Sequence, residues 1–324
     1  MNKSKKFIIG GGVSGLTFAF YHPEYTIITP DVGGLFASAY IAILHDTTET
    51  RHFLKDLGYK NVDNLNRKSY IGYYNAGWIS DYATKATKTL AIQKKMTDWD
   101  KPVDKNFTPE SFDMSTSTST NYLKVLDIEP KEIIEKLSAN IGNIIEGKVV
   151  SISDTDVLVE ASDGTQTHIQ YDSLVSTIGA PIFWKLYGQP REFPCKPITN
   201  IITNECPPLF NDNYDIIYYD DSVLYSRITH LQESYAIEIT GNMTDDQIRE
   251  HFPTTPVKVV VRVPYGRISN VKDNAPPNDK ITFLGRFAEW KYGVVLETVL
   301  RRTLEFNSKP MVDGDNLLEN EILI

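Results

Sequence analysis

The sequence predicts an α/β protein in which a Rossmann-type dinucleotide-binding domain is joined to a second, mixed α+β domain. Three observations carry this prediction. An apolar segment leads into "GGGVSGL", which contains G-x-G-x-x-G and opens a second apolar segment of helical composition. Another apolar segment follows so soon that the unit spans about 30 residues, the length of a right-handed crossover between parallel strands. Further along, the pattern changes to short segments of alternating apolar and polar residues, as in strands.

Local patterns in the N-terminal half predict two strands and three helices. The strands are expected over residues 6–9 and 24–29. The helices are expected over residues 13–21, 48–59 and 130–142. The first helix ends at His22 because Pro23 pushes the residue before it out of the α region. The third begins at Pro130, since proline suits the first position of a helix.

Strands dominate the second half. They are expected over 148–153, 156–161, 165–171, 173–179, 214–220, 222–231, 234–240, 258–263 and 281–287. An amphipathic helix is expected over 293–306, starting near Gly293. Residues 69–78 are rich in tyrosine and predict a half-buried strand, with stacking on a substrate ring as the alternative. The polar stretch 97–122 cannot supply a core and predicts a loop, either a linker or a lid.

The composition is that of an ordinary globular protein, with 324 residues, 41% of them hydrophobic, and a net charge of −9. An acidic surface does not neutralise phosphates, so a nucleic-acid partner is not expected, although a local basic groove is compatible with this charge. No run of about 18–20 apolar residues predicts a membrane span. Glycines interrupt the apolar residues after "MNKSKK", so no signal peptide is expected and the predicted location is the cytoplasm.

The opening glycines have separate mechanical reasons. Gly10 allows a tight turn out of the strand, Gly12 leaves room for a pyrophosphate, and Gly15 permits close contact between helix and strand. The backbone N–H groups of Val13 and Ser14 then point at the phosphates, whose charge the helix dipole favours. The alternative is a packing turn without a ligand. The position of the motif between a strand and a helix favours nucleotide binding.

The end of the second strand lacks the acidic residue that usually holds the ribose hydroxyls. Thr29 occupies that position and Asp31 follows after a proline, so either side chain could reach the ribose. A second glycine pair, Gly33 and Gly34, comes soon afterwards. Such a pair is typical of proteins that bind FAD in this fold, and the predicted cofactor is therefore FAD.

These motifs resemble the FAD family that contains amine oxidases, protoporphyrinogen oxidase and, more closely, UDP-galactopyranose mutase. "IIGGGVSGL" and "VGGLF" are similar to its two N-terminal FAD motifs, which adds Leu35 to the expected cofactor contacts. "AILHDTTETRHFLKDLG" is similar to a mutase segment whose histidine implies that His45 lies near the flavin ring. "KVVSI" and "YDSLVSTIGAP" are similar to strands of the FAD site, and the resemblance makes Val149 the adenine contact.

Two further segments extend the resemblance towards a substrate. "LYSRITH" resembles a mutase stretch that makes Arg227 a candidate active-site cation. "FLGRFAEWKYG" resembles the mutase signature "GRLAEYKY", which implies Gly285 and Arg286 beside the cofactor and Tyr292 facing the substrate. The helix after Tyr292 would aim its N-terminus at the flavin and stabilise its anionic reduced form. The chain departs from the mutases in being shorter and in having "YGV" where they have "YYD".

The resemblance implies a discontinuous division of the chain. Residues 1–60, 140–180 and 275–308 are expected to form the FAD-binding domain, 61–139 and 181–274 a substrate domain, and 309–324 a C-terminal tail. Cys195 and Cys206 lack metal-binding spacing and activating neighbours, so neither a metal nor a covalent flavin link is expected. His22, His52 and His230 show no ligand spacing either.

Three classes of function fit these observations. The first is an FAD-dependent, amine-oxidase-like oxidoreductase that acts through flavin N5 on a small polar, possibly nucleotide-linked substrate. The second is a redox-neutral mutase of a nucleotide sugar, and a flavoenzyme for a modified nucleotide or nucleic-acid base is a related alternative. The third is a binding or scaffold protein that keeps the fold without turnover. The sequence makes no prediction of oligomeric state.

Overall fold

The computed structural model describes most of the chain. The described residues are 5–34, 44–75, 77–80, 84–106, 122–231, 233–269, 271 and 273–306. Leu35, one of the expected cofactor contacts, and residues 107–121 of the polar stretch lie outside these ranges.

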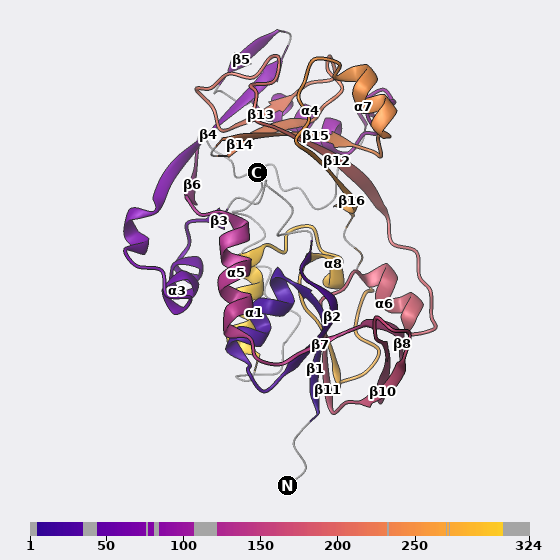
Figure 1. Cartoon of the computed structure of the whole chain (residues 1–324). Helices are drawn as coiled ribbons and strands as arrows, with labels where there is room; N and C mark the ends of the chain where they lie inside the picture. Colours follow the sequence, from indigo (N-terminus) through magenta and orange to yellow (C-terminus); the bar gives the residue numbers. More distant parts are fainter. Residues whose placement is uncertain are drawn as a thin grey trace.

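A five-stranded parallel sheet forms one half of the molecule, with the order β17-β11-β1-β2-β7 (Figure 1). Its strands are β1 (Lys6–Gly12), β2 (Thr26–Gly33), β7 (Ile144–Glu146), β11 (Ser173–Ser176) and β17 (Ile281–Phe283). Every neighbouring pair in this sheet is parallel. The predicted Rossmann-type parallel sheet is therefore confirmed, and it draws its strands from both ends of the chain.

Helices cover one face of the parallel sheet. They are α1 (Val13–Tyr21), α3 (Thr48–Asp56), α5 (Pro130–Asn140) and α9 (Leu296–Glu305), with a short 3₁₀ turn at Val62–Asn64. Apolar side chains of these helices, such as Leu16, Phe53 and Leu300, pack with Ile8 and Ile27 of the sheet in a single buried cluster. Burying these side chains supplies the hydrophobic stabilisation of this half.

A small antiparallel sheet and two helices cover the opposite face. The elements are β8 (Lys148–Ile152), β9 (Asp156–Glu160), β10 (Gln166–Gln170), α6 (Ala180–Leu186) and α8 (Arg286–Glu289). Trp184 and Trp290 are fully buried there and pack with Ile9 and Ile28 of the parallel sheet. The parallel sheet is thus covered on both sides, as parallel sheets generally are.

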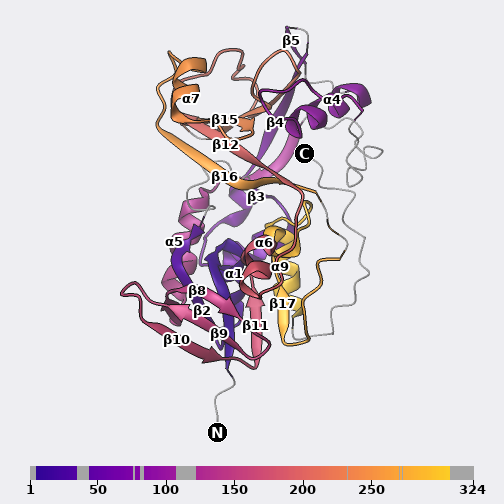
Figure 2. The ribbon, with the colours of Figure 1, turned by 90° about the vertical axis from the view of Figure 1, so that its right-hand side faces the viewer.

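A larger mixed sheet forms the other half, ordered β16-β12-β15-β14-β13-β4-β6-β3 with β5 beside β4. Its strands are β3 (Leu44–His45), β4 (Asn66–Asn75), β5 (Trp78–Ser80), β6 (Tyr122–Leu126), β12 (Cys195–Thr203), β13 (Ile216–Tyr219), β14 (Arg227–Leu231), β15 (Ser234–Thr240) and β16 (Val259–Ile268). Helices α4 (Lys85–Lys95) and α7 (Asp245–His251) lie on opposite sides of it (Figure 2). The predicted second sheet domain is confirmed.

The two faces of this second sheet differ in character. The face under α7 is apolar, and Ile237, Ile239 and Ile248 belong to its core cluster. The other face carries Glu238 and Thr240 at the alternating positions of the same strand, and both side chains are buried. Alternation along a strand sends successive side chains to opposite faces, so this second face is a buried polar surface.

The C-terminal boundary differs from the sequence-based prediction. The amphipathic helix begins at Leu296 rather than near Gly293, and a four-residue helix, α8, precedes it. Trp290 ends α8 in the left-handed conformation with φ of 55°. The chain therefore turns twice between the last strand and the last helix. None of the helices in the described ranges combines the length and apolarity that crossing a membrane requires.

Candidate cofactor and substrate site

The glycine-rich loop places three glycines in three different environments. Gly10 has φ of 106°, a conformation that side chains disfavour. A Cβ atom on Gly15 would lie 2.0 Å from the carbonyl oxygen of Gly10, so the helix packs directly on the end of the strand. Gly12 has no heavy atom within 4 Å of the position a Cβ would take. The backbone at Gly12 is therefore open to a ligand.

The N-terminus of α1 lies at this open position. Gly12 is the N-cap residue, and it supplies no side-chain hydrogen bond to the helix. The first turn, which contains Val13 and Ser14, has no acidic residue to neutralise the helix dipole. N–H groups at a helix N-terminus bind anions under these conditions. The loop can thus hold a phosphate group.

The second glycine pair lies beside the first motif. Gly33 is the register partner of Gly12 across β1 and β2. Gly34 has φ of 53°, and a Cβ atom on it would be 3.5 Å from the Cα atom of Gly12. The two motifs therefore lie side by side, and a phosphate-containing ligand over Gly12 would also come close to Gly34.

The two candidate ribose contacts are placed differently. The Thr29 side chain is buried, its hydroxyl oxygen accepts from the Gly11 N–H at 3.1 Å, and the hydroxyl donates to the Asp31 carbonyl oxygen at 2.5 Å. The Asp31 side chain is exposed. Thr29 thus ties the strand end to the glycine loop, which leaves Asp31 as the side chain that can reach outward.

The C-terminal motif packs on the same helix N-terminus. Gly285 has φ of 100°, and a Cβ atom on it would lie 2.6 Å from the hydroxyl oxygen of Ser14. Its N–H donates to Glu289 Oε1 at 3.0 Å, and Glu289 forms an ion pair with Arg302 of α9. The glycine motifs from the two ends of the chain therefore meet at one place. Val149, the expected adenine contact, is buried in β8 and packs in a cluster with Ile28 of β2.

His45 lies at the N-terminus of α9. Its Nδ1 atom is 3.3 Å from the Oε1 atom of Glu297, which belongs to the first turn of that helix. Both side chains are largely buried. The family resemblance implies that His45 lies near a flavin ring, and the last helix is expected to face the same ring. The structure brings His45 to the N-terminus of that helix. Glu297 was not a candidate from the sequence.

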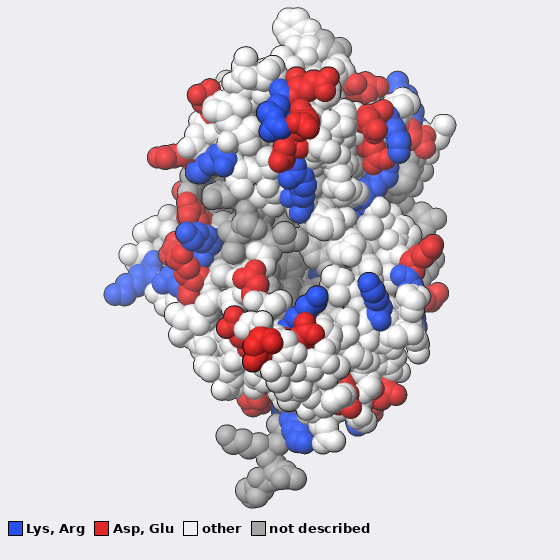
Figure 3. Space-filling view, turned by 45° about the vertical axis from the view of Figure 1, so that its right-hand side comes forward, with Lys and Arg blue, Asp and Glu red and all other residues white. Residues whose placement is uncertain are grey.

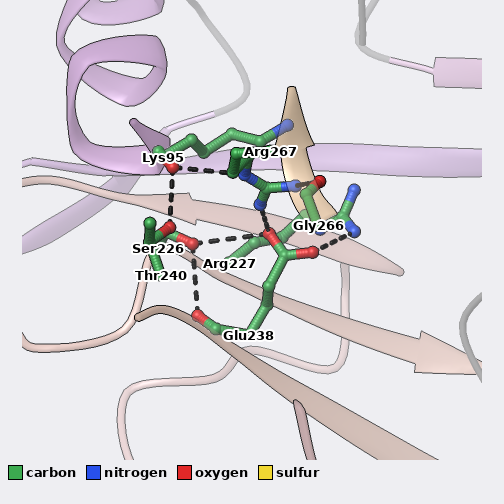
Figure 4. A network of polar contacts seen from close by, with 7 residues as sticks. All are labelled: Lys95, Ser226, Arg227, Glu238, Thr240, Gly266 and Arg267. Carbon is green, nitrogen blue, oxygen red and sulfur yellow. Dashed lines mark hydrogen bonds and ion pairs between the residues drawn. The ribbon is translucent and has the colours of Figure 1, made fainter. Parts of the chain in front are cut away.

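Arg227 belongs to a buried network on the polar face of the second sheet (Figure 4). Glu238 pairs with Arg227 across β14 and β15, and Arg227 Nη2 lies 2.7 Å from Glu238 Oε2. Arg267 donates to the other oxygen of the same carboxylate. Burial raises the pKa of Glu238, but the positive charges of Arg227 and Arg267 outweigh burial and lower that pKa to about 2. Glu238 is therefore ionised at neutral pH.

Lys95 completes the network from the end of α4. Its carbonyl oxygen accepts from Arg267 Nε at 3.1 Å and from the Thr240 hydroxyl at 2.6 Å. Its side chain is buried, with Nζ 5.1 Å from the centroid of the Tyr218 ring. The last turn of α4 is thus held on β15 and β16, with the ammonium group among buried side chains.

Arg286 and Tyr292 approach this network from the other half of the molecule. The Arg286 guanidinium carbon lies 5.1 Å from the Tyr292 ring centroid, and its Nε donates to the Val294 carbonyl oxygen. Burial alone raises the pKa of the Tyr292 hydroxyl. The positive charges of Lys95, Arg267 and Arg286 outweigh it and lower that pKa to about 7.

We call Lys95, Arg227, Arg267 and Arg286 the cation cluster. Among the described residues, Glu238 is the carboxylate that acts on Lys95, Arg227 and Arg267 and on Tyr292. Four cations against one carboxylate leave an excess of positive charge. Buried charge of one sign attracts an ion of the other. The molecular surface is hollowed between the two halves that supply the cluster (Figure 3). The arrangement suits a ligand with a negatively charged group.

A row of polar and aromatic side chains crosses the same face of the sheet. The register aligns Asn200, Glu238, Arg227, Tyr218 and Tyr73 across five neighbouring strands, so their side chains share one face. Asn200 Oδ1 is buried without a hydrogen-bond partner, and the Tyr218 hydroxyl and the Arg227 guanidinium have each other as their polar neighbours. The Tyr73 and Tyr218 rings stack with centroids 5.6 Å apart. Buried polar atoms usually have partners, so Asn200 Oδ1 can serve a bound ligand.

The cysteines are not among the residues of this site. Cys195 and Cys206 are free thiols, and burial raises the pKa of each. Within the described ranges, no group of three or more His, Cys, Asp or Glu side chains is placed to hold a metal ion.

Known proteins share the fold at low sequence identity. No family model and no curated protein sequence matches the chain. The structure of reduced UDP-galactopyranose mutase matches with a TM-score of 0.64 and 12% identity, over 94% of this chain and 93% of that one. An oxidoreductase from Methanosarcina mazei matches with a TM-score of 0.59 and 12% identity, over 94% of this chain and 100% of that one. BrvH, a flavin-dependent halogenase from Brevundimonas sp. BAL3, matches with a TM-score of 0.51 and 14% identity, over 93% of this chain and 70% of that one.

These likenesses establish the fold. The chain has the two-part architecture of the mutase, the oxidoreductase and the flavin-dependent halogenase. The resemblance drawn from the sequence motifs is thereby confirmed as a shared fold. The identity of 10–14% carries no substrate or reaction from any of these proteins to this chain.

Proposed function

We propose that this chain is a flavoenzyme that binds FAD non-covalently. The observation that carries the proposal is the meeting of Gly12, Gly34 and Gly285 around the N-terminus of α1, with open space over Gly12. The FAD diphosphate would bind the N–H groups of Val13 and Ser14, where no acidic residue or side-chain cap competes. These residues fit a dinucleotide because its phosphates need both a close backbone and a helix N-terminus.

The remaining cofactor contacts follow from the placement of the strands. Asp31 is exposed at the end of β2 and would hold the ribose. The backbone at Val149 in β8 would hold the adenine, as the family resemblance implies. His45 and the first turn of α9 would lie beside the isoalloxazine ring. We assign this cofactor role to residues 1–60, 140–180 and 275–308, and the substrate role to 61–139 and 181–274.

Bound FAD would supply two-electron chemistry at its N5 atom. The residues of the chain would bind and orient the substrate there. Arg227, held by Glu238, would position a negatively charged or polar group of the substrate. Tyr292 would face the same group from the other half of the molecule.

The cation cluster bears on the choice among reactions. An amine-oxidase-like oxidoreductase acting on a small polar, possibly nucleotide-linked substrate fits, provided that the substrate carries negative charge near the cluster. A protonated amine at that position would be repelled by Lys95, Arg227 and Arg267. The same charges fit the alternative of a redox-neutral, mutase-type isomerase of a nucleotide sugar, and that of a flavoenzyme acting on a modified nucleotide or base.

Replacing Gly12 by alanine tests the cofactor proposal. We expect a loss of FAD affinity of at least tenfold, because a methyl group would occupy the space of the diphosphate. The free energy of unfolding of the cofactor-free protein should change by less than about 0.5 kcal/mol. The backbone at Gly12 has φ of −75°, which alanine adopts freely, and the added Cβ atom meets nothing. Flavin absorbance titration and urea denaturation measure the two quantities.

Gly142→Ala is the matched control, since a Cβ atom on Gly142 also meets nothing within 4 Å. It should change neither FAD affinity nor stability. Wild-type FAD affinity in the Gly12→Ala variant would contradict the proposed position of the diphosphate.

A substrate panel distinguishes the reactions. We expect anionic substrates to be turned over and small cationic amines to be inert, because of the cation cluster. Flavin bleaching by a substrate, followed by peroxide release, would support the oxidoreductase. Turnover only after reduction with dithionite, with no net consumption of electrons, would support the isomerase. Turnover of a cationic amine alone would contradict the role of the cluster.

A further inference from the structure

We propose that binding of an anion in the cation cluster is coupled to the uptake of one proton by Tyr292. The ligand and the ionised Tyr292 hydroxyl would compete for the same positive charges. This inference rests on the anion-binding part of the proposed function and does not require bound flavin. It concerns a step that precedes any chemistry on the substrate.

The placement of Tyr292 supports the coupling. The Arg286 guanidinium carbon lies 5.1 Å from the centroid of its ring. Lys95 on α4, Arg267 on β16, Arg286 on α8 and Glu238 on β15 all act on the charge of its hydroxyl. Arg227 on β14 also interacts with Tyr292. Tyr292 therefore lies where the two halves of the molecule bring their charges together.

Glu238 cannot balance the cluster alone. Its two carboxylate oxygens are each bound by a guanidinium group, one from Arg227 and one from Arg267. One carboxylate offsets one of the four positive charges, and the three that remain stabilise additional negative charge nearby. Two groups can provide that charge, the phenolate of Tyr292 and an incoming anion. Each makes the other less favourable, because two negative charges in one buried site repel each other.

The direction of the coupling follows from linkage. The pKa of about 7 means that Tyr292 is half ionised near neutral pH in the free protein. A bound anion offsets the positive charges that lower this pKa, so the pKa rises and the phenolate oxygen takes up a proton from solvent. No covalent bond of the ligand changes. Below pH 7 the hydroxyl is already protonated, and above pH 7 each binding event requires a proton.

The coupling would give the substrate a protonated partner. A substrate that carries its own negative charge into the cluster converts Tyr292 from a phenolate into a neutral phenol. The hydroxyl can then donate a hydrogen bond to the group that displaced its charge. The acid form of Tyr292 is thus present when substrate is bound, although it is only partly present in the free protein at pH 7.

Sulfate is a suitable probe, because it carries the same charge throughout the pH range in which Tyr292 would titrate. Binding is measured by calorimetry on the full-length protein in buffers of different ionisation enthalpy, which reports the protons taken up. We expect about one proton per sulfate at pH 8 and almost none at pH 6. The affinity should fall about tenfold from pH 6 to pH 8.

Tyr292→Phe removes the titrating hydroxyl and keeps the ring. This variant should bind sulfate without proton uptake and with the same affinity at pH 6 and pH 8. Tyr265→Phe is the matched control, because burial raises the pKa of Tyr265 and removes it from this pH range. The control should behave as the wild-type protein does.

Three results would overturn the inference: sulfate binding without proton uptake in the wild-type protein, unchanged uptake in Tyr292→Phe, and no sulfate binding at all. If FAD affinity and the Gly12→Ala effect persist in any of these cases, the cofactor proposal stands separately. If Tyr292→Phe does not fold, the ultraviolet difference spectrum of the wild-type protein decides. Loss of phenolate absorbance on adding sulfate at pH 8 supports the coupling, and an unchanged spectrum overturns it.

Discussion

Replacing Glu238 by glutamine is expected to lower the free energy of unfolding by about 3–5 kcal/mol. The variant keeps the shape of the side chain and removes its charge. Arg227 and Arg267 then remain buried without the carboxylate that both of them bind, and an uncompensated buried charge is among the costliest changes in a protein. Urea denaturation at pH 7 measures the effect.

The pH dependence of this effect provides a second check. The folded-state pKa of Glu238, about 2, lies below its ordinary value of 4.5. The charged form therefore contributes its full stabilisation above pH 4.5, and this contribution is lost as the pH falls through about 2. The stability difference between the wild-type protein and Glu238→Gln should shrink over the same range.

Glu250→Gln serves as the control, because Glu250 is exposed on α7. Its expected effect is within about 0.5 kcal/mol. A Glu238→Gln variant that unfolds at the same urea concentration as this control would contradict the network shown in Figure 4.

Replacing Gly15 by alanine is expected to destabilise the protein by about 3 kcal/mol or more and to abolish FAD binding. Glycine-to-alanine changes inside helices usually stabilise by about 1 kcal/mol, so the predicted sign is reversed here. The reason is the 2.0 Å separation between the added Cβ atom and the carbonyl oxygen of Gly10. The Cβ atom is bonded directly to the backbone and the oxygen is part of it, so neither can rotate away. β1 and α1 would therefore have to move apart.

Thermal denaturation and flavin titration measure the two effects. Gly12→Ala provides the comparison, since it alters the same loop without a steric conflict. Gly15→Ala should lose both stability and FAD, and Gly12→Ala should lose FAD alone. A Gly15→Ala protein as stable as the wild type would show that the contact between helix and strand is not as close as the structure has it.

Much of the parallel-sheet half was predictable because its signals are local. The helix over Val13–Tyr21 was predicted with the bounds that the structure has, since glycines mark its start and Pro23 its end. The strands of the small antiparallel sheet were also predicted to within one residue at each end, because alternation and the turn at 162–165 act over a few residues.

The cation cluster was only partly predictable. Arg227 was a candidate through a family resemblance, whereas Lys95, Glu238 and Arg267 were not candidates. In "SYAIEIT", Glu238 alternates with apolar residues, and such a pattern normally indicates a strand face open to solvent. The structure buries that face, so the polar side chains form a site instead of a surface. Alternation reports that two faces differ, and it does not report what covers each of them.

The sequence by itself determined the strand, turn and helix at Gly10–Gly15, because steric limits on the backbone act between residues close together in the chain. From this follow the parallel sheet and the expectation of a dinucleotide. Only the tertiary structure decided that Lys95, Arg267 and Arg286 surround Tyr292. These residues belong to separate elements, and their electrostatic effect depends on distance and burial in space, which no spacing along the chain records.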